Sequence, residues 1–84
     1  MEFVPGDEAK DSLQARGLTF EMILEAIADG KTLDFQPSPT RPGQMLLIVE
    51  ICGYVHVAAC ERRGHRWRII TAYPSRKHHK QHHP

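Results

Sequence analysis

The chain has 84 residues and a mass of 9.6 kDa, which suffices for one small domain and excludes a two-domain enzyme. With 40% hydrophobic and 25% charged residues, the composition excludes an intrinsically disordered chain. The longest apolar run, Met45–Val49, is far shorter than the roughly 18 residues that cross a bilayer. No signal peptide is visible, and two cysteines are too few for a disulfide scaffold. We therefore expect a cytoplasmic protein that is not bound to a membrane.

The formal net charge of +1 hides a strong division of charge along the chain. Residues 1–61 carry ten acids against four bases, a balance of −6. Residues 62–84 carry seven bases and no acid, a balance of +7. This division favours a site for a polyanion at the C-terminal end. The alternative is a solubilising tail whose positive field is balanced by the acidic front half.

The first third of the chain predicts two helices. Residues 1–6 suggest a short strand or arm, and Asp7–Ala15 a short helix whose apolar face is thin. Thr19–Asp29 is the clearest element, with Thr19 as its N-cap. Apolar residues recur there at i, i+3, i+4 and i+7, which indicates one buried helical face: Phe20, Ile23, Leu24 and Ile27.

Acidic residues repeat every four positions on the outer side of this second helix: Glu21, Glu25 and Asp29. Like charges at this spacing repel one another weakly. A merely solvated face explains them best, and a docking surface for a basic partner is the alternative.

The remaining chain predicts strands joined by tight turns. The proline-rich segment 37–43 forms a surface loop, because its three prolines cannot donate to a sheet. Cys52-Gly53 is a two-residue hairpin turn, and residues 61–65 form a five-residue hairpin loop. The predicted strands are Thr32–Gln36, Gln44–Ile51, Tyr54–Cys60 and Arg66–Ala72. The expected fold is α+β, with two N-terminal helices packed on one face of a three- to four-stranded antiparallel sheet.

Strand alternation divides these side chains between two faces of the sheet. We assign to the helices, as the core, the face that holds Leu46, Ile48, Val55, Val57, Ala59, Trp67 and Ile69. The opposite face then holds Leu47, Val49, Ile51, Tyr54, His56, Arg66, Arg68 and Ile70. We expect a partner protein or the C-terminal segment to cover the aliphatic part of this second face, and its polar part to meet phosphate. Alternatively, its arginines are ordinary strand residues.

Three short motifs resemble the BrnT family of toxins from type II toxin–antitoxin systems: Asp7–Lys10, Arg16–Glu21 and Arg68–Tyr73. Arg16 stands where that family usually has a histidine, and Tyr73 where many members carry an arginine. The resemblance implies a RelE-like fold over residues 1–77, followed by a flexible His-rich tail at 78–84. It also implies a ribosome-associated or free mRNA endoribonuclease that inhibits translation, neutralised by a cognate antitoxin in a toxin–antitoxin hetero-oligomer.

Metal-free RNA cleavage uses the substrate 2′-OH as nucleophile, so the protein must move protons and stabilise a phosphorane. Arginine forks match phosphate oxygens, and histidine titrates near neutrality. The candidate catalytic residues are Lys10, His56, Arg66 and Arg68, of which the resemblance supports Lys10 and Arg68 and face geometry alone supports His56. The candidate RNA-binding residues are Tyr54, Tyr73, Arg76 and Lys77. A strand histidine can equally be structural.

The six histidines raise the question of a metal site, since those at 78, 79, 82 and 83 could pair at i, i+4 on a helix. The tail offers no cysteine or acid as a further ligand, so we expect no metal and no cofactor. Cys52 and Cys60 lack the spacing of a metal motif and are expected to be free thiols. The alternative function is a non-catalytic nucleic-acid-binding or antitoxin-docking module of the same fold.

Overall fold

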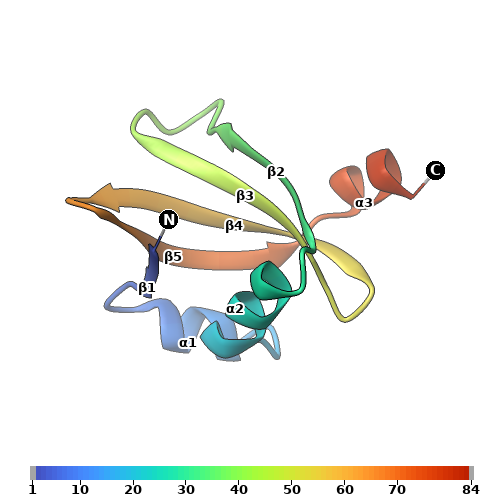
Figure 1. The fold of residues 1–84 in the computed structure, drawn as a ribbon, viewed down its shortest axis with the longest axis horizontal. Helices are drawn as coiled ribbons and strands as arrows, with labels where there is room; N and C mark the ends of the chain where they lie inside the picture. The colour runs from blue at the N-terminus through green and yellow to red at the C-terminus, as the bar shows by residue number, and fades with distance from the viewer. Residues whose placement is uncertain (1, 84) are drawn as a thin grey trace.

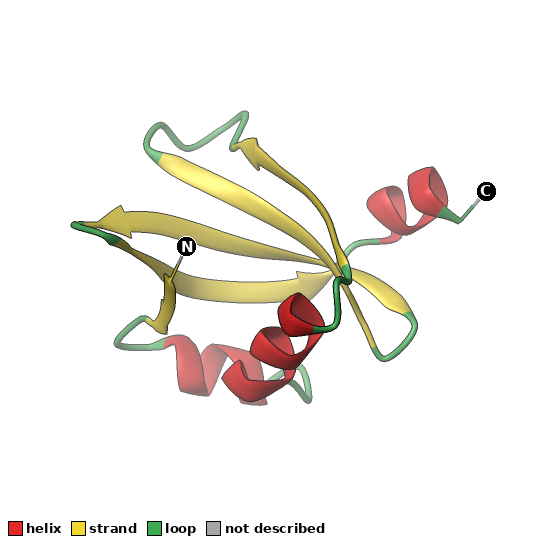
Figure 2. Cartoon of the chain, viewed as in Figure 1, coloured by secondary structure: helices red, strands yellow, loops and turns green. Residues whose placement is uncertain are grey.

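The computed structural model describes residues 2–83 as an α+β fold with a five-stranded mixed sheet and three helices (Figures 1 and 2). The order of strands across the sheet is β1-β5-β4-β3-β2. Along the chain, the elements are β1 (Glu2–Pro5), α1 (Ala9–Gln14), α2 (Phe20–Ala28), β2 (Thr32–Pro37), β3 (Gln44–Ile51), β4 (Tyr54–Arg63), β5 (Arg66–Pro74) and α3 (Arg76–His82). None of the helices within residues 2–83 is long and apolar enough to cross a bilayer.

The predicted architecture is wrong in its sheet and in its number of helices. The N-terminal segment is a true strand, β1, which pairs parallel to β5 from Glu2 opposite Arg66 to Pro5 opposite Ile69. The sheet is therefore mixed and has five strands rather than three or four in antiparallel order. A four-residue strand carries little local signal, because its stability comes from a partner more than sixty residues away.

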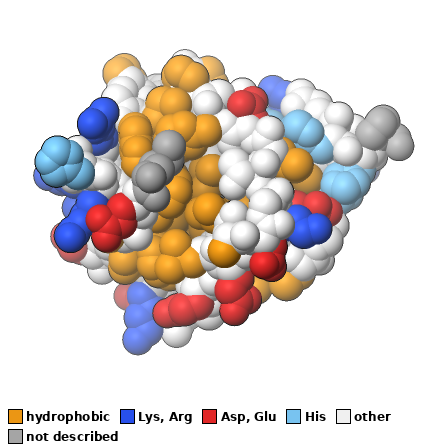
Figure 3. Space-filling view, in the orientation of Figure 1, with side chains coloured by type: hydrophobic (Ala, Val, Ile, Leu, Met, Phe, Trp, Pro, Cys, Tyr) orange, Lys and Arg blue, Asp and Glu red, His pale blue; other side chains and the backbone are white. Residues whose placement is uncertain are grey.

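Helices α1 and α2 cover one face of the sheet (Figures 1 and 2). Thr19 caps α2 as predicted, with its side chain accepting a hydrogen bond from the Met22 backbone N–H at 3.1 Å. Ile23 is fully buried, whereas Leu24 is 37% exposed, so the buried stripe of α2 is narrower than the sequence predicts. Hydrophobic side chains gather between the strands and these helices (Figure 3).

The predicted assignment of faces is wrong for β3 and β4. The core cluster beneath the helices contains Leu47, Val49 and Ile51, which the sequence analysis placed on the opposite face. The residues expected beneath the helices form a smaller buried cluster on the other side of the sheet: Ile48, Val55 and Val57. Both faces of these strands are apolar, so alternation cannot decide which face the helices cover. In β5, Trp67 and Ile69 do pack into the helix-side core as predicted.

The two hairpin predictions have opposite outcomes. The Cys52-Gly53 turn is confirmed, with both residues at positive φ and Ile51 opposite Tyr54. The predicted five-residue loop at 61–65 is wrong, because β4 continues to Arg63 and the register shifts between Ala59 and Cys60. Because β4 ends at Arg63 and β5 begins at Arg66, a two-residue turn at Gly64-His65 sets Glu61 opposite Arg68.

The C-terminal helix α3 occupies most of the segment expected as a flexible tail. Ser75 caps it, since its side chain accepts from the His78 backbone N–H at 3.3 Å. The helix packs against β4, at the right of Figure 1. Pro84, the last residue of the expected tail, lies outside the described residues.

Candidate nucleic-acid interface

The structure does not bring the four candidate catalytic residues together. Lys10 is exposed on α1, next to the start of α2. His56 lies in β4 opposite Val49, on the face that the helices cover, and is only 8% exposed. Its Nδ1–H donates to the Tyr54 carbonyl oxygen at 2.8 Å, which is the structural role considered as the alternative for this histidine.

The two strand arginines share the opposite face, but each is paired with an acid. Arg66 Nε donates to Glu2 Oε1 at 3.0 Å. Arg68 forms an ion pair with Glu61, its partner across the β4–β5 hairpin, and its Nη1 lies 4.0 Å from Asp7 Oδ2. These acids neutralise the two guanidinium charges that were expected to bind a phosphate.

The candidate RNA-binding residues are also dispersed. Tyr54 stacks on His79 with ring centroids 4.1 Å apart and planes 8° from parallel, so one face of its ring is occupied. Tyr73 is 37% exposed near the end of β5. Arg76 and Lys77 are exposed in the first turn of α3. Of these four, Tyr73 alone lines the groove described next.

A groove of about 560 Å³ lies on the sheet face opposite α2, and we call it the cationic groove. Leu46 and Ala59 contribute to its floor, in the strand positions that alternate with the core residues beneath the helices. The loop after β2 and the ends of α1 and α3 provide its walls. The polar residues with long side chains or hydroxyl groups around it include Arg16, Arg41, Gln44, Thr71, Tyr73 and His78.

Among the described residues that line this groove there is no aspartate or glutamate. Within residues 2–83, neither Arg16 nor Arg41 lies within 4.0 Å of a carboxylate oxygen, in contrast to Arg66 and Arg68. Two uncompensated guanidinium groups around an apolar floor create a positive potential in a concave surface. The groove is therefore suited to an anion, and above all to phosphate.

A side-chain network holds Arg16 in position at the end of α1. Its Nη1 donates to the Ser12 backbone oxygen at 3.1 Å and to the Ser12 hydroxyl at 3.3 Å. The Ser12 hydroxyl in turn bonds the hydroxyl of Thr71 in β5. This chain of contacts fixes the guanidinium relative to the sheet and leaves donors for a ligand.

His78 contributes an imidazole to the same groove. Its Nδ1 is 2.8 Å from the Ser75 hydroxyl, which can donate or accept there and so permits either ring tautomer. Among residues 2–83, no hydrogen bond engages Nε2 of His78. The groove thus combines two guanidinium groups with an imidazole and a phenol, which are groups that can transfer protons.

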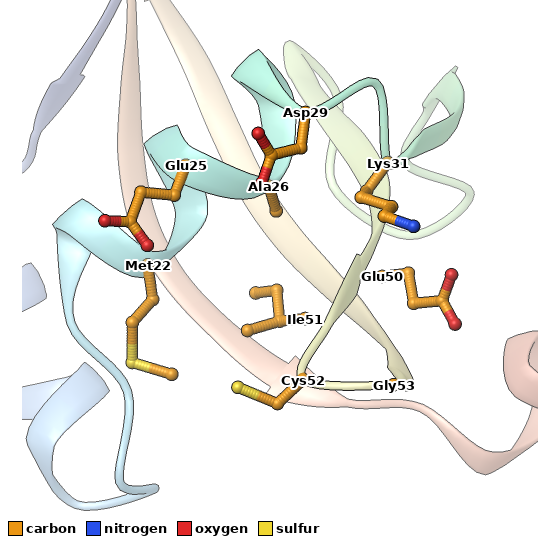
Figure 4. A pocket seen from close by; sticks show the side chains of 9 residues that line it. All are labelled: Met22, Glu25, Ala26, Asp29, Lys31, Glu50, Ile51, Cys52 and Gly53. Atoms are coloured by element: carbon orange, nitrogen blue, oxygen red, sulfur yellow. The ribbon is translucent and has the colours of Figure 1, made fainter.

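A second groove, of about 300 Å³, has the opposite charge, and we call it the acidic groove (Figure 4). Glu25 and Asp29 project from α2 and Glu50 lies at the end of β3, with Lys31 the one cation among the lining residues. Two members of the acidic repeat, Glu25 and Asp29, thus border a concave surface that repels phosphate. Its apolar lining consists mainly of Met22, Ala26 and Ile51.

Residues 2–83 contain neither a candidate metal site nor a reactive buried thiol. Within residues 2–83, no group of three or more histidine, cysteine, aspartate or glutamate side chains could hold a metal ion. Both cysteines are free thiols, Cys52 exposed and Cys60 buried. Burial raises the pKa of the Cys60 thiol to about 12, so this group stays protonated at neutral pH.

Sequence reasoning missed three of the groove residues. Arg16 and Arg41 belong to the acidic half of the chain, where the charge count gave no reason to expect a phosphate site. His78 was assigned to the tail. The one available signal was the motif Arg16–Glu21, in which Arg16 stands where the BrnT family usually has a histidine.

The chain belongs to the DUF4258 family, described as a domain of unknown function, which it matches over residues 6–74. Comparison with curated proteins and with solved structures gives no significant match. The matched segment contains Arg16, Arg41 and Tyr73 of the cationic groove. It ends before α3, and so before His78.

Proposed function

We propose that this chain binds single-stranded RNA in the cationic groove and is the toxin component of a type II toxin–antitoxin system. On this proposal it cuts mRNA in the cytoplasm, free or on the ribosome, and a cognate antitoxin neutralises it. One observation carries the proposal: within residues 2–83, the groove joins two arginines without an acid partner, Arg16 and Arg41, to Tyr73 and His78, and no aspartate or glutamate lines it.

The groove supplies guanidinium groups for the phosphate and one imidazole for a proton transfer. Arg16 and Arg41 bind the phosphate and stabilise the charge that develops on the phosphorane. Nε2 of His78 takes the proton from the 2′-OH or returns one to the leaving 5′-oxygen. Tyr73, exposed beside it, offers a ring on which a base can stack.

The second candidate is a module of the same fold that binds RNA without cutting it. The placement of the residues named by the BrnT resemblance favours this alternative. Lys10 and Arg68 do not line the cationic groove, and Arg68 is already paired with Glu61. Binding through Arg16 and Arg41 requires none of these residues.

The test uses a fluorescein-labelled single-stranded RNA and a DNA of the same sequence. Fluorescence anisotropy measures binding, and gel electrophoresis measures cleavage. We expect Arg16→Ala combined with Arg41→Ala to weaken RNA binding at least ~100-fold, because each charge-assisted contact contributes about 1.5–3 kcal/mol. Lys31→Ala combined with Arg62→Ala removes the same charge outside the groove and should change the affinity less than about threefold.

Cleavage distinguishes the two candidates. A toxin nuclease should cut the RNA and leave the DNA intact, because the DNA lacks the 2′-OH nucleophile. His78→Ala should abolish cleavage and leave most of the binding. RNA that is bound and never cut would establish the non-catalytic module instead. Equal affinity of the wild type and the Arg16/Arg41 variant would contradict both candidates.

A further inference from the structure

We propose that α3 is a pH-sensitive arm: neutral His79 holds it against β4, and protonation of His79 releases it and withdraws His78 from the cationic groove. The contacts of α3 itself hold it in its docked position. The consequence for RNA rests on the proposed function of the groove.

Val55 makes two backbone contacts with the C-terminal segment. Its N–H donates to Nδ1 of His79 at 3.2 Å, and its carbonyl oxygen accepts from the Ser75 N–H at 3.0 Å. The β4–β5 ladder ends at the neighbouring residue, His56, which faces Pro74, so Val55 has no strand partner in β5. The His79 ring therefore takes the place of the next strand partner for a residue that is fully buried.

Aromatic stacking also holds α3 against β4. Tyr54 lies face to face with His79, and the rings of His79 and His83 stack with centroids 4.6 Å apart. No residue of α3 is itself buried. The helix consequently depends on these polar and stacking contacts rather than on an apolar face of its own.

The hydrogen bond from Val55 exists only while Nδ1 of His79 is unprotonated. A proton at Nδ1 would point at the Val55 N–H, and both donors would lose their acceptor. A proton at this position therefore favours the released form, so the docked fraction should fall as the pH is lowered.

Among the described residues, Tyr54 on β4 and His83 on α3 stack on His79, while His56 on β4 contacts Tyr54 and Glu50 on β3 contacts His83. His56 meets the edge of the Tyr54 ring, with the ring centroids 6.1 Å apart, rather than His79 itself. His83 Nε2 lies 3.3 Å from Glu50 Oε1, a contact that protonation of His83 would strengthen. That pair is partly exposed and screened by solvent, so it opposes the release weakly.

Release of α3 acts on the groove through His78, the neighbour of His79 in the chain. On release, His78 leaves the wall of the cationic groove. Arg16 and Arg41 belong to other elements and stay in the groove. His79 is thus a positioning residue for His78. Its loss should reduce RNA cleavage more than RNA binding.

The experiment follows the Val55 amide by NMR hydrogen exchange in the full chain, without RNA. In the wild type we expect protection at about pH 7.5, and at least a ~10-fold loss of protection, after correction for the intrinsic rate, at about pH 5.5. His79→Phe keeps a ring on Tyr54 and removes the acceptor, so the amide should be unprotected at both pH values. His82→Phe is the matched control, since His82 is exposed on the same helix, and it should behave as the wild type.

Two results overturn the inference: Val55 protection that persists in His79→Phe, or wild-type protection that does not change down to about pH 5.5. The wild-type titration decides the question alone if His79→Phe fails to fold. With RNA present, His79→Phe should lower the cleavage rate about tenfold and the affinity less than about threefold. Protection that follows His79 while no RNA binds would support the arm and overturn only the proposed function.

Discussion

The acidic and cationic grooves differ in where their charges come from as well as in sign. The acidic groove gathers carboxylates from α2 and β3, all within the acidic half of the sequence. The cationic groove takes Arg16 and Arg41 from that same half, not from the basic C-terminal third. A count of charge along the chain therefore predicts the first groove and misplaces the second.

The reason lies in pairing across the fold. The strand arginines of the basic segment meet acids, Arg66 with Glu2 and Arg68 with Glu61. The loop that carries Arg41 and the helix end that carries Arg16 bring no acid within pairing distance in residues 2–83. Arg16 and Arg41 are thus among the cations that the fold leaves unpaired, and they share one groove.

The largest expected effect concerns the two thiols, one of which reports on the acidic groove. Cys52 lines that groove and is exposed, whereas Cys60 is in the core with its pKa raised to about 12 by burial. At about pH 8, Cys52 should react with a disulfide reagent at least ~1,000-fold faster than Cys60, because only about 1 in 10,000 Cys60 thiols is ionised. Absorbance of the released thiolate should show one thiol in the native protein and two in denaturant.

A label at Cys52 also tests the comparison of the grooves. RNA affinity should not change when Cys52 carries a bulky adduct, since the acidic groove has no part in binding. Rapid reaction of both thiols in the native protein would contradict the buried core position of Cys60. A large loss of affinity on labelling would indicate that RNA binds in the acidic groove, and would contradict binding in the cationic groove.

Charge reversal should give the next largest effect. Arg16→Glu with Arg41→Glu should lower RNA affinity at least ~100-fold, since two favourable contacts of about 1.5–3 kcal/mol each become repulsive. Glu25→Lys with Asp29→Lys should leave the affinity unchanged or raise it by less than about fivefold through the general field of the protein. Anisotropy titrations at one fixed salt concentration measure both, and an equal loss in the two variants would remove the distinction between the grooves.

The smallest effect is expected from the support of Arg16. Thr71→Val removes the hydroxyl that bonds Ser12, and so loosens the side chain that Arg16 contacts. We expect RNA affinity to fall about fivefold, equivalent to about 1 kcal/mol, with little change in the groove's salt dependence. Thr71→Ser keeps the hydroxyl and is the matched control. If Thr71→Val binds as tightly as the wild type, the network does not position Arg16.

Local pattern was enough to predict the α2 cap at Thr19 and the Cys52-Gly53 turn, because each depends on neighbouring residues. It could not predict the pairing of β1 with β5 or the face that the helices cover, because Ile48 and Val49 are equally apolar. The candidate site failed for the same reason. The turn between β4 and β5 has two residues, Gly64 and His65, rather than the five expected, and this shorter turn sets Glu61 opposite Arg68.

The central claim is that the phosphate contacts of this chain are made by Arg16 and Arg41. The salt dependence of RNA binding tests it most directly, because each phosphate contact on a single strand adds about 0.7 to the slope of log affinity against log salt concentration. Arg16→Gln with Arg41→Gln should reduce that slope by about 1.4, whereas Arg62→Gln with Arg66→Gln should leave it unchanged. The reverse pattern would return the binding site to the basic C-terminal third and contradict the account.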